Sequence, residues 1–276
     1  MHPNQPADQP KPPIPGIRHL IAVGSGKGGV GKTTVAVNLA IALSKLGYRT
    51  GLLDADVYGP NVPLMLGVSQ QPYAVDNRIV PLEQAGLQLM SMGFLNPGEK
   101  PLIWRGPMLH SVIGQFLRGT EWGELDYLVI DLPPGTGDVQ LSLIQTAPLT
   151  GAIVVTTPSD VSLEDARKAV NMFRQVRVEI LGLVENMSYL TAPQSGERID
   201  VFGSGGGRRT AEAMKVHFLG ELPLNPEIRI GGDTGNAVAW RGEQDAAAKA
   251  FYAMAREAAQ RAENAAGAGP KITIED

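Results

Sequence analysis

The chain has 276 residues, 43% of them hydrophobic, so it is long enough to bury a sizeable core in one large α/β domain. Its 24 basic and 28 acidic residues give a net charge of −4 without a dense basic block, which argues against nucleic acid as the main partner. The absence of cysteine excludes disulfides and thiolate metal sites, and no apolar run is long enough to span a membrane.

The N-terminal segment differs in composition from the rest of the chain. Residues 1–16 hold six prolines and few apolar residues, which is typical of a disordered or extended leader and not of a secretory signal. We therefore expect a cytoplasmic protein without a membrane anchor. A single domain is predicted over residues 17–264, followed by a flexible tail over 265–276.

The first strand and helix of this domain flank a glycine-rich loop. Residues 20–23 form an apolar run typical of a buried strand, and residues 34–46 carry the apolar stripe of a helix. Backbone N–H groups of such a loop wrap phosphate oxygens at a helix N-terminus, where the dipole also favours an anion. The pattern predicts an ATP site with Lys32 along the β- and γ-phosphates and the Thr33 hydroxyl on Mg²⁺. The predicted ATP-binding residues here are Gly24, Ser25, Gly26, Lys27, Gly28, Gly29, Val30, Gly31, Lys32, Thr33 and Thr34.

A dinucleotide site is the alternative for the same loop. Gly24, Gly26 and Gly29 also satisfy the pattern G-x-G-x-x-G, and Asp54 ends the next predicted strand, near where a ribose-binding acid is expected. That pattern is short, whereas the triphosphate pattern asks for specific residues at more positions. A lysine aimed at the phosphates is no part of the dinucleotide pattern, so we favour the triphosphate.

Short apolar strands then alternate with helical patterns along the chain. This alternation predicts an α/β fold with a doubly wound, mostly parallel sheet and helices on both faces, in which ligands bind at the carboxyl ends of the strands. Predicted strands are 50–54, 87–92, 127–131, 152–156, 181–186 and 218–222, and the clearest helices are 108–117, 139–146, 163–176, 208–216 and 244–263.

Acidic residues end two of these strands. Asp54 and Asp56 follow the second strand, and one of them is expected to face the phosphates, where it would orient the attacking water or support the metal's water shell. Asp131 ends the fourth strand and is predicted to hold Mg²⁺ through water. The Gly135 amide follows it and is expected to sense the γ-phosphate and to move the segment behind it. Loop-capping aspartates and an ordinary turn are the plainer alternatives.

Four motifs in this order resemble the Mrp/ApbC family of deviant P-loop ATPases, which is related to nitrogenase iron protein and to the septum-site regulator MinD. They lie at residues 27–33, 54–61, 131–138 and 185–189, and the resemblance runs from about residue 17 to residue 263. It implies a homodimer in which Lys27 reaches the partner's phosphates. It also implies that Asp56 positions the hydrolytic water and that Asn186 binds the adenine. With Lys32 and Asp131, Lys27 and Asp56 complete the predicted catalytic set.

The chain departs from the family at the cluster ligands. Members described as iron–sulfur carriers place Cys-x-x-Cys after the fourth motif and pool these thiolates at the dimer interface, but here Ala192 and Ser195 stand at those positions. Neither a methyl group nor a neutral hydroxyl replaces a thiolate ligand. The four histidines are scattered along the sequence and suggest no replacement. A 4Fe–4S cluster is thus implied by the resemblance only, and we predict that none binds stably.

Two accounts of this departure are open. Either the chain is a natural cysteine-free member that keeps the ATP-driven switch, or its ligands were replaced. In the first case cluster donors or apo-acceptor proteins are possible partners. The competing function is an ATP-controlled positioning switch like MinD on membranes or ParA on DNA, but residues 251–258 have core-like spacing and not the basic, bulky faces of a membrane-seeking helix.

Overall fold

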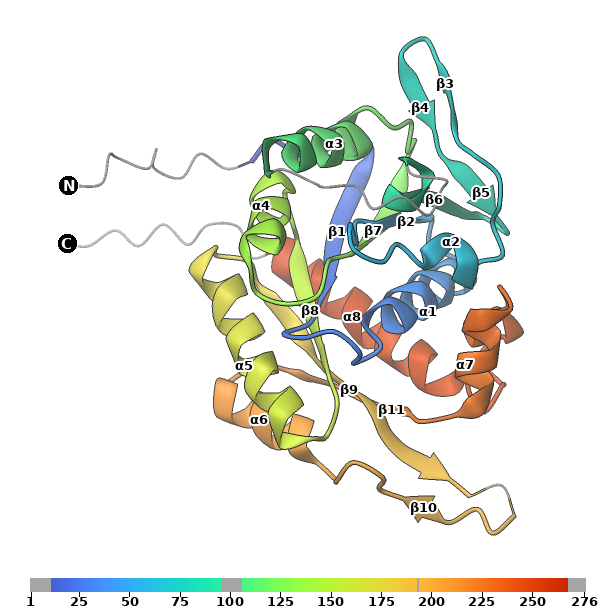
Figure 1. Cartoon of the computed structure of the whole chain (residues 1–276), viewed down its shortest axis with the longest axis vertical. Helices are drawn as coiled ribbons and strands as arrows, with labels where there is room; N and C mark the ends of the chain where they lie inside the picture. The colour runs from blue at the N-terminus through green and yellow to red at the C-terminus, as the bar shows by residue number, and fades with distance from the viewer. Residues whose placement is uncertain (1–10, 96–105, 193, 268–276) are drawn as a thin grey trace, which may run out of the picture.

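The protein is described by a computed structural model over residues 11–95, 106–192 and 194–267, with side-chain detail from residue 108 in the middle segment (Figure 1). A nine-stranded sheet in the order β10-β9-β8-β1-β7-β2-β6-β5, with β11 beside β9, forms its centre. Strands β1, β2, β6, β7, β8, β9 and β11 pair in parallel. Their bounds are β1 Ile17–Gly24, β2 Thr50–Asp54, β6 Leu87–Ser91, β7 Leu125–Asp131, β8 Gly151–Thr156, β9 Ile180–Thr191 and β11 Phe218–Pro223.

Alternation along the central strands divides the core into two layers. In β1, Ile21 and Val23 pack on one face with α1 and α8, whereas Leu20 and Ala22 pack on the other face with α3, α4 and α5. Helices therefore cover both faces, as predicted. The bounds of these helices are α1 Lys32–Lys45, α3 Gly106–Arg118, α4 Asp138–Thr146, α5 Asp160–Gln175, α6 Gly206–Met214 and α8 Lys249–Gly267.

Several short elements were not predicted. After β2 the chain forms α2 Val62–Met65, then the separate hairpin of β3 Tyr73–Val75 and β4 Arg78–Val80, and then β5 Leu82–Gln84, which pairs antiparallel with β6. The 3₁₀ turn η1 Met92–Leu95 follows β6. Near the C-terminus, α7 Pro226–Asp233 begins at the N-cap Asn225, whose side chain accepts a hydrogen bond from the amide of Glu227, and the 3₁₀ turn η2 Val238–Arg241 precedes α8.

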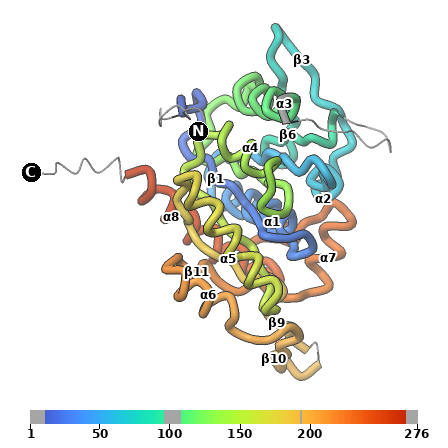
Figure 2. The backbone as a smooth tube through the Cα atoms, turned by 60° about the vertical axis from the view of Figure 1, so that its left-hand side comes forward, coloured from blue at the N-terminus to red at the C-terminus, as the bar shows by residue number. Residues whose placement is uncertain are grey.

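Strand β9 runs five residues further than predicted. Beyond residue 186 it stays beside β11 as far as Tyr189, and Leu190 and Thr191 then pair antiparallel with β10 Arg198–Ile199. Residues 187–192 and 194–203 thus project from one end of the molecule as an arm (Figures 1 and 2). Met187 has a φ of 54°, a left-handed conformation that side chains other than glycine rarely adopt, at the point where the arm begins. Ala192 and Ser195 lie in this arm.

The last residues of the expected leader pack onto the domain. We expected the fold to begin near Ile17, yet Ile14 is buried in the layer beneath α3 and α4. The ammonium of Lys11 donates to the carbonyl oxygens of Ile144 and Ala147, at the C-terminal end of α4. At the other end, α8 continues to Gly267, into the segment expected to be a tail. The rest of the leader and tail lies outside the described residues.

Candidate active site

The loop between β1 and α1 has the backbone of an anion cradle. Gly29 and Gly31 both have a φ of 81°, and a Cβ atom on Gly31 would lie 2.2 Å from Nδ2 of Asn186. A Cβ on Gly26 would lie 2.0 Å from the carbonyl oxygen of Asp165. Gly31 is also the N-cap of α1, and no side chain caps this end of the helix. The first-turn amides of α1 therefore face the loop as donors for phosphate oxygens.

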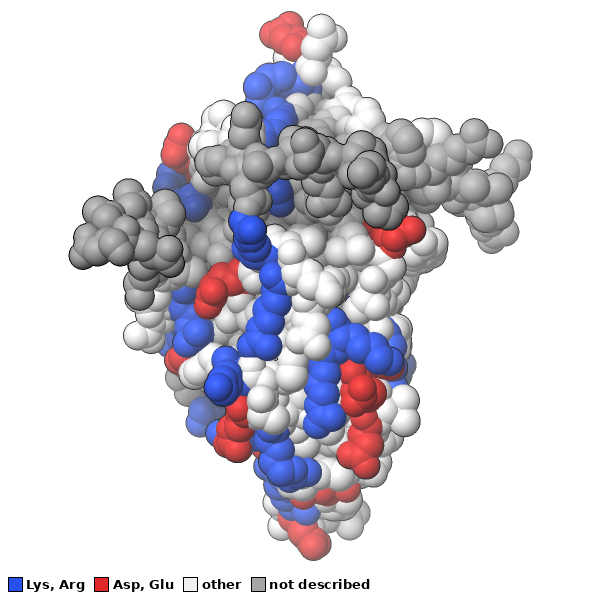
Figure 3. All heavy atoms as spheres, turned by 90° about the vertical axis from the view of Figure 1, so that its left-hand side faces the viewer, with Lys and Arg blue, Asp and Glu red and all other residues white. Residues whose placement is uncertain are grey.

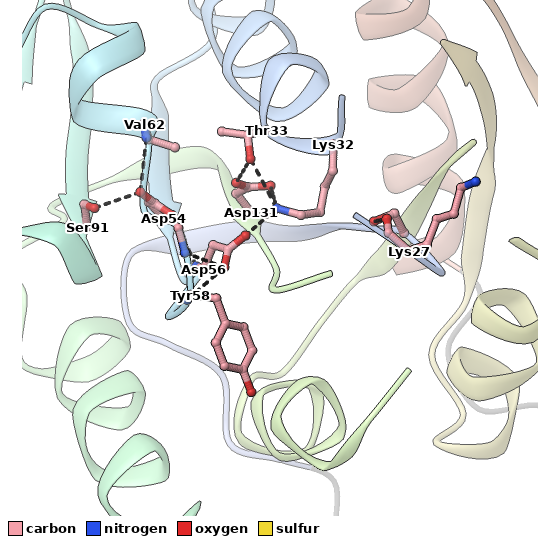
Figure 4. A network of polar contacts seen from close by, with 11 residues as sticks. Lys27, Lys32, Thr33, Asp54, Asp56, Tyr58, Val62, Ser91 and Asp131 are labelled. Carbon is pink, nitrogen blue, oxygen red and sulfur yellow. Dashed lines mark hydrogen bonds and ion pairs between the residues drawn. The ribbon is translucent and has the colours of Figure 1, made fainter. Parts of the chain in front are cut away.

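Lys32 connects the two predicted acids (Figure 4). Its ammonium lies 2.7 Å from Oδ1 of Asp131 and 3.4 Å from Oδ2 of Asp56, and only 6% of the side chain is exposed. Burial raises the pKa of Asp131, and the neighbouring ammonium of Lys32 acts in the opposite direction. The structure thus brings three of the four predicted catalytic residues together from α1, β7 and the loop after β2.

The predicted metal ligands are adjacent. The hydroxyl of Thr33 donates to Oδ2 of Asp131 at 2.7 Å. A hydroxyl beside a carboxylate is a hard oxygen donor set of the kind that Mg²⁺ takes together with waters and phosphate oxygens. Around it, the buried carboxylates of Asp56 and Asp131 share the single ammonium of Lys32. This excess of carboxylates fits a divalent cation, so the residues present match a magnesium site.

Asp54 has a different role from its neighbour Asp56. The Asp54 carboxylate is fully buried and accepts hydrogen bonds from the amides of Asp56 and Val62, each at 3.2 Å, and from the Ser91 hydroxyl at 2.8 Å. Burial, and then the charge of Asp131, raises the pKa of Asp54 to about 8. Because its acceptors are all used by the protein, Asp54 fixes the loop that carries Asp56. The sequence left open which acid faces the phosphates, and the geometry favours Asp56.

Asp56 is presented to the phosphate loop by its own turn. Its Oδ1 accepts hydrogen bonds from the amides of Tyr58 at 3.1 Å and Gly59 at 3.3 Å, while Oδ2 faces Lys32. A cavity of about 400 Å³ lies in front of these groups. Its lining includes Ser25, Lys27, Gly28, Gly29, Gly31, Lys32, Thr33, Thr34, Asp56, Tyr58 and Pro134.

Lys27 lines this cavity but does not join the Lys32 cluster. Figure 4 shows its side chain pointing away from Lys32 and Asp131, and within the described residues it makes no ion pair. Gly135, the predicted sensor of the γ-phosphate, contacts the phosphate loop directly. Its amide donates to the carbonyl oxygen of Ser25 at 3.0 Å, and its φ is 100°.

A second cavity, of about 460 Å³, shares Thr33, Thr34 and Asn61 with the first. Asn186 lies between its wall and the phosphate loop and donates from Nδ2 to the carbonyl oxygen of Val30 at 2.8 Å. In the part of the chain that is described, Oδ1 of Asn186 makes no hydrogen bond, so it remains as an acceptor. The cavity fits a base beside the triphosphate. Its other lining residues, which the sequence analysis missed, include Met65, Pro223, Leu224, Asn225, Ile228 and Arg229.

The wall of the second cavity that the sequence analysis missed is formed mainly by β11, α7 and the residues between them. Asn225 followed by Pro226 is a recognisable start of a helix, with an N-cap side chain and proline in the first turn. That signal was present in the sequence and predicts α7. Nothing local indicates that this helix faces the phosphate loop, because the contact depends on β9 and β11 lying side by side.

The positions of the family's cluster ligands do not form a metal site. Ala192 and Ser195 lie in the tight turn of the arm, where the Gly196 amide donates to the Ala192 carbonyl oxygen at 2.9 Å and the Glu197 amide contacts the Ser195 hydroxyl. Among residues 11–95, 106–192 and 194–267, no three His, Asp or Glu side chains gather as metal ligands. The sequence has no cysteine. A cluster held by thiolates therefore does not fit this chain.

None of the helices in the described part of the chain has the length and apolar character that crossing a bilayer requires.

The face formed by α4, α5 and α6 mixes both charge signs, with lysines and arginines interspersed with acidic side chains (Figure 3). On α5, Arg167 pairs with Glu164 and Lys168 with Asp165. Paired charges of this kind give no uninterrupted basic surface for DNA.

The chain matches the family model of the NUBPL iron-transfer P-loop NTPases, within ParA, over residues 16–259. It is 50% identical over 254 residues to an iron–sulfur cluster carrier protein of Aquifex aeolicus, covering 91% of this chain and 70% of that protein. It is 47% identical over 247 residues to the iron–sulfur cluster transfer protein NUBPL of Dictyostelium discoideum, covering 88% of this chain and 76% of that protein.

Two solved structures are similar in fold. A nucleotide-binding protein in complex with ADP from Archaeoglobus fulgidus has a TM-score of 0.73 and 38% identity, covering 82% of this chain and 89% of that one. MinD complexed with Mg-ADP from Pyrococcus horikoshii has a TM-score of 0.65 and 25% identity, covering 87% and 95%.

These likenesses confirm the predicted fold and the resemblance drawn from the motifs. The greater identity to cluster carriers than to MinD favours a cluster-related function over the positioning switch. P-loop NTPases hydrolyse nucleoside triphosphates, and this chain is an enzyme of that class. With its phosphate loop, its paired acids and a family match over residues 16–259, the chain belongs to the family of NUBPL iron-transfer P-loop NTPases.

Proposed function

We propose that the chain is a magnesium-dependent ATPase whose nucleotide state controls a homodimer, and that it serves iron–sulfur cluster assembly without holding a cluster on its own thiolates. The observation that carries the ATPase proposal is the convergence of Lys32, Thr33 and Asp131 behind an uncapped helix N-terminus. Adenine specificity is supported by the cavity beside Asn186.

The residues divide the work of hydrolysis between binding and orientation. Lys32 exchanges its carboxylate partners for β- and γ-phosphate oxygens, which frees an oxygen of Asp131 for the metal's water shell. Thr33, directly, and Asp131, through water, would hold Mg²⁺, which would supply positive charge to neutralise the phosphate oxygens. Asp56, fixed through Oδ1 by its own turn, keeps Oδ2 free to orient the attacking water. Lys27, aimed outward, is available to the partner subunit's phosphates.

Replacement of Lys32 tests the nucleotide site. We expect K32A to lose measurable ATP·Mg²⁺ binding in calorimetry and to lose turnover, because the ammonium is the only buried cation among the described residues that line the loop. K45A, at the exposed end of the same helix, is the matched control and should bind ATP as the wild type does. Unchanged ATP binding and turnover in K32A would contradict the assignment.

The cluster proposal has a separate test. The relatives named as cluster carriers support a role in cluster delivery, whereas the ligand positions here hold Ala192 and Ser195. Anaerobic reconstitution with iron and sulfide should leave the purified protein without chelator-resistant iron and without a charge-transfer absorption band. As a control, the double variant A192C/S195C, which restores the ligand pair, should gain both signals. Stoichiometric iron on the cysteine-free chain would refute the proposal.

A further inference from the structure

Gln140 has a buried side-chain amide for which the described part of the chain offers no hydrogen-bond partner. It is the third residue of α4 and only 1% exposed, and within the described residues neither its Nε2 nor its Oε1 makes a hydrogen bond. Buried side-chain amides are nearly always paired, because an unpaired one loses its hydration without compensation. A leucine of similar size would avoid that cost, so the position of this glutamine calls for a functional explanation.

The amide lies against the start of the phosphate loop. Nε2 is 3.0 Å from the position that a Cβ atom on Gly24 would occupy, and the ring of Phe173 is equally close to that position. A side chain on Gly24 would therefore displace Gln140. The next residue, Ser25, is fully buried, and its carbonyl oxygen accepts the 3.0 Å hydrogen bond from the Gly135 amide. Gln140 thus lies against Gly24, and Gly135 contacts the next residue of the loop, Ser25.

The Gly135 amide has one proton and two possible acceptors. In the present arrangement it donates to the carbonyl oxygen of Ser25. The segment before Gly135 is also held against β1, because the Leu132 amide donates to the Val23 carbonyl oxygen at 3.0 Å. If Gly135 donates to a γ-phosphate, as the proposed function requires, it must leave Ser25. The buried carbonyl oxygen of Ser25 then needs another donor.

We propose that Gln140 is a positioning residue that replaces Gly135 as the donor to Ser25 when Gly135 turns to the γ-phosphate. The carbonyl oxygen of Ser25 then exchanges one hydrogen bond for another, and Nε2 of Gln140 gains an acceptor. The inference rests on the proposed function, since it assumes a triphosphate on the loop. ADP has no γ-phosphate and leaves the Gly135–Ser25 bond in place. Gln140 therefore favours binding of the triphosphate over the diphosphate. Because it belongs to the first turn of α4, it also makes the position of that turn depend on which nucleotide is bound.

The test compares affinities for AMP-PNP and ADP, each with Mg²⁺, by calorimetry on the full chain. We expect Q140L to bind AMP-PNP about tenfold more weakly than the wild type, the equivalent of one hydrogen bond, and to bind ADP unchanged. Q145L makes the same substitution on the same helix at an exposed position and should alter neither affinity. Without nucleotide, Q140L should be at least as resistant to urea as the wild type.

Each outcome has a distinct meaning. If the wild type binds neither nucleotide, the proposed function fails. If the wild type binds both and Q140L weakens them equally, or weakens neither, the inference about Gln140 is wrong while the ATPase proposal stands. Lower urea resistance of nucleotide-free Q140L than of Q145L would also overturn it, because the amide would then be paired in that state.

A measurement on the wild type avoids any folding defect of the variant. In ¹⁵N-labelled protein, the side-chain amide resonance of Gln140 should shift on addition of AMP-PNP·Mg²⁺ and stay in place with ADP·Mg²⁺. An identical response to the two nucleotides would contradict the exchange.

Discussion

At the scale of single residues, the two acids after β2 differ in what surrounds them. Asp54 is enclosed by three donors from the protein, whereas Asp56 keeps one oxygen directed at Lys32 and the cavity. Sequence alone treats them as a pair two positions apart. Their environments indicate that Asp54 holds the loop in place, whereas Asp56 is available to act on the bound nucleotide.

Asparagine substitutions separate these tasks. D56N should retain ATP binding and lose at least about 100-fold in turnover, since a positioned carboxylate contributes about that much to proton transfer and water orientation. Single-turnover hydrolysis checks the rate, and calorimetry checks the binding. A D56N variant that hydrolyses ATP normally would remove Asp56 from this role.

D54N should lower stability instead. At about pH 9, above the pKa of Asp54, the ionised carboxylate supplies two acceptor oxygens where an amide supplies one, and the NH₂ group of the amide would face another donor. We therefore expect a loss of about 1–3 kcal/mol in the free energy of unfolding at that pH. Urea titration measures the change. The control D76N, in the exposed turn between β3 and β4, should stay within about 0.5 kcal/mol of the wild type. Equal stability of D54N and the wild type would argue against the structural role.

At the scale of elements, two strand starts are joined by one ion pair. The Asp126 carboxylate, at the start of β7, accepts hydrogen bonds from the Arg49 amide at 2.9 Å and from its guanidinium at 3.2 and 3.3 Å, just before β2 begins. These bonds hold the pKa of Asp126 below its usual range. The pair lies next to the first paired residues, Thr50 and Tyr127, of the register that places Asp54 beside Asp131.

The pKa of Asp126 predicts a pH dependence. Because the folded-state value lies below the unfolded one, the unfolded chain takes up a proton first as the pH falls. The contribution of Asp126 is then present above about pH 4 and is lost as the pH falls through the folded-state pKa. The stability difference between the wild type and D126N should be constant from pH 7 to 5 and shrink below about pH 4. Urea midpoints check this, with E124Q as the control; a difference that grows in acid would contradict it.

At the scale of the whole molecule, the chain presents Lys27 outward beside its own phosphate loop. This direction suits a lysine that acts on a second subunit. In the D56N variant, which should not hydrolyse ATP, we expect ATP·Mg²⁺ to shift the protein from monomer to dimer in light scattering. The double variant K27A/D56N should show no such shift. K168A, on α5, should leave the shift intact. A K27A variant that dimerises and hydrolyses ATP normally would rule out the proposed action on the partner.

Much of the fold could be predicted because its signals are local. The apolar runs of β2, β7 and β8 and the stripe of α1 are determined by neighbours in sequence, so their strands and helices were predicted within a few residues. The β3–β4 hairpin was missed because its strands are short and exposed and carry no clear alternation of buried residues. The arm was missed because the pairing of β9 with β10 bridges a turn that local patterns do not mark.

The order of residues was enough to predict the chemistry that the loop permits: the phosphate cradle, Lys32, Thr33 and Asp131, and the absence of thiolates. Spacing along one segment is sufficient for these, because the backbone of a strand, loop and helix places them. The folded arrangement was needed to show which acid is enclosed, which wall closes the base cavity, where Lys27 points and that Gln140 makes no hydrogen bond within the described residues. Those properties depend on burial and on donors from distant segments, and desolvation has no signature in the order of residues along a chain.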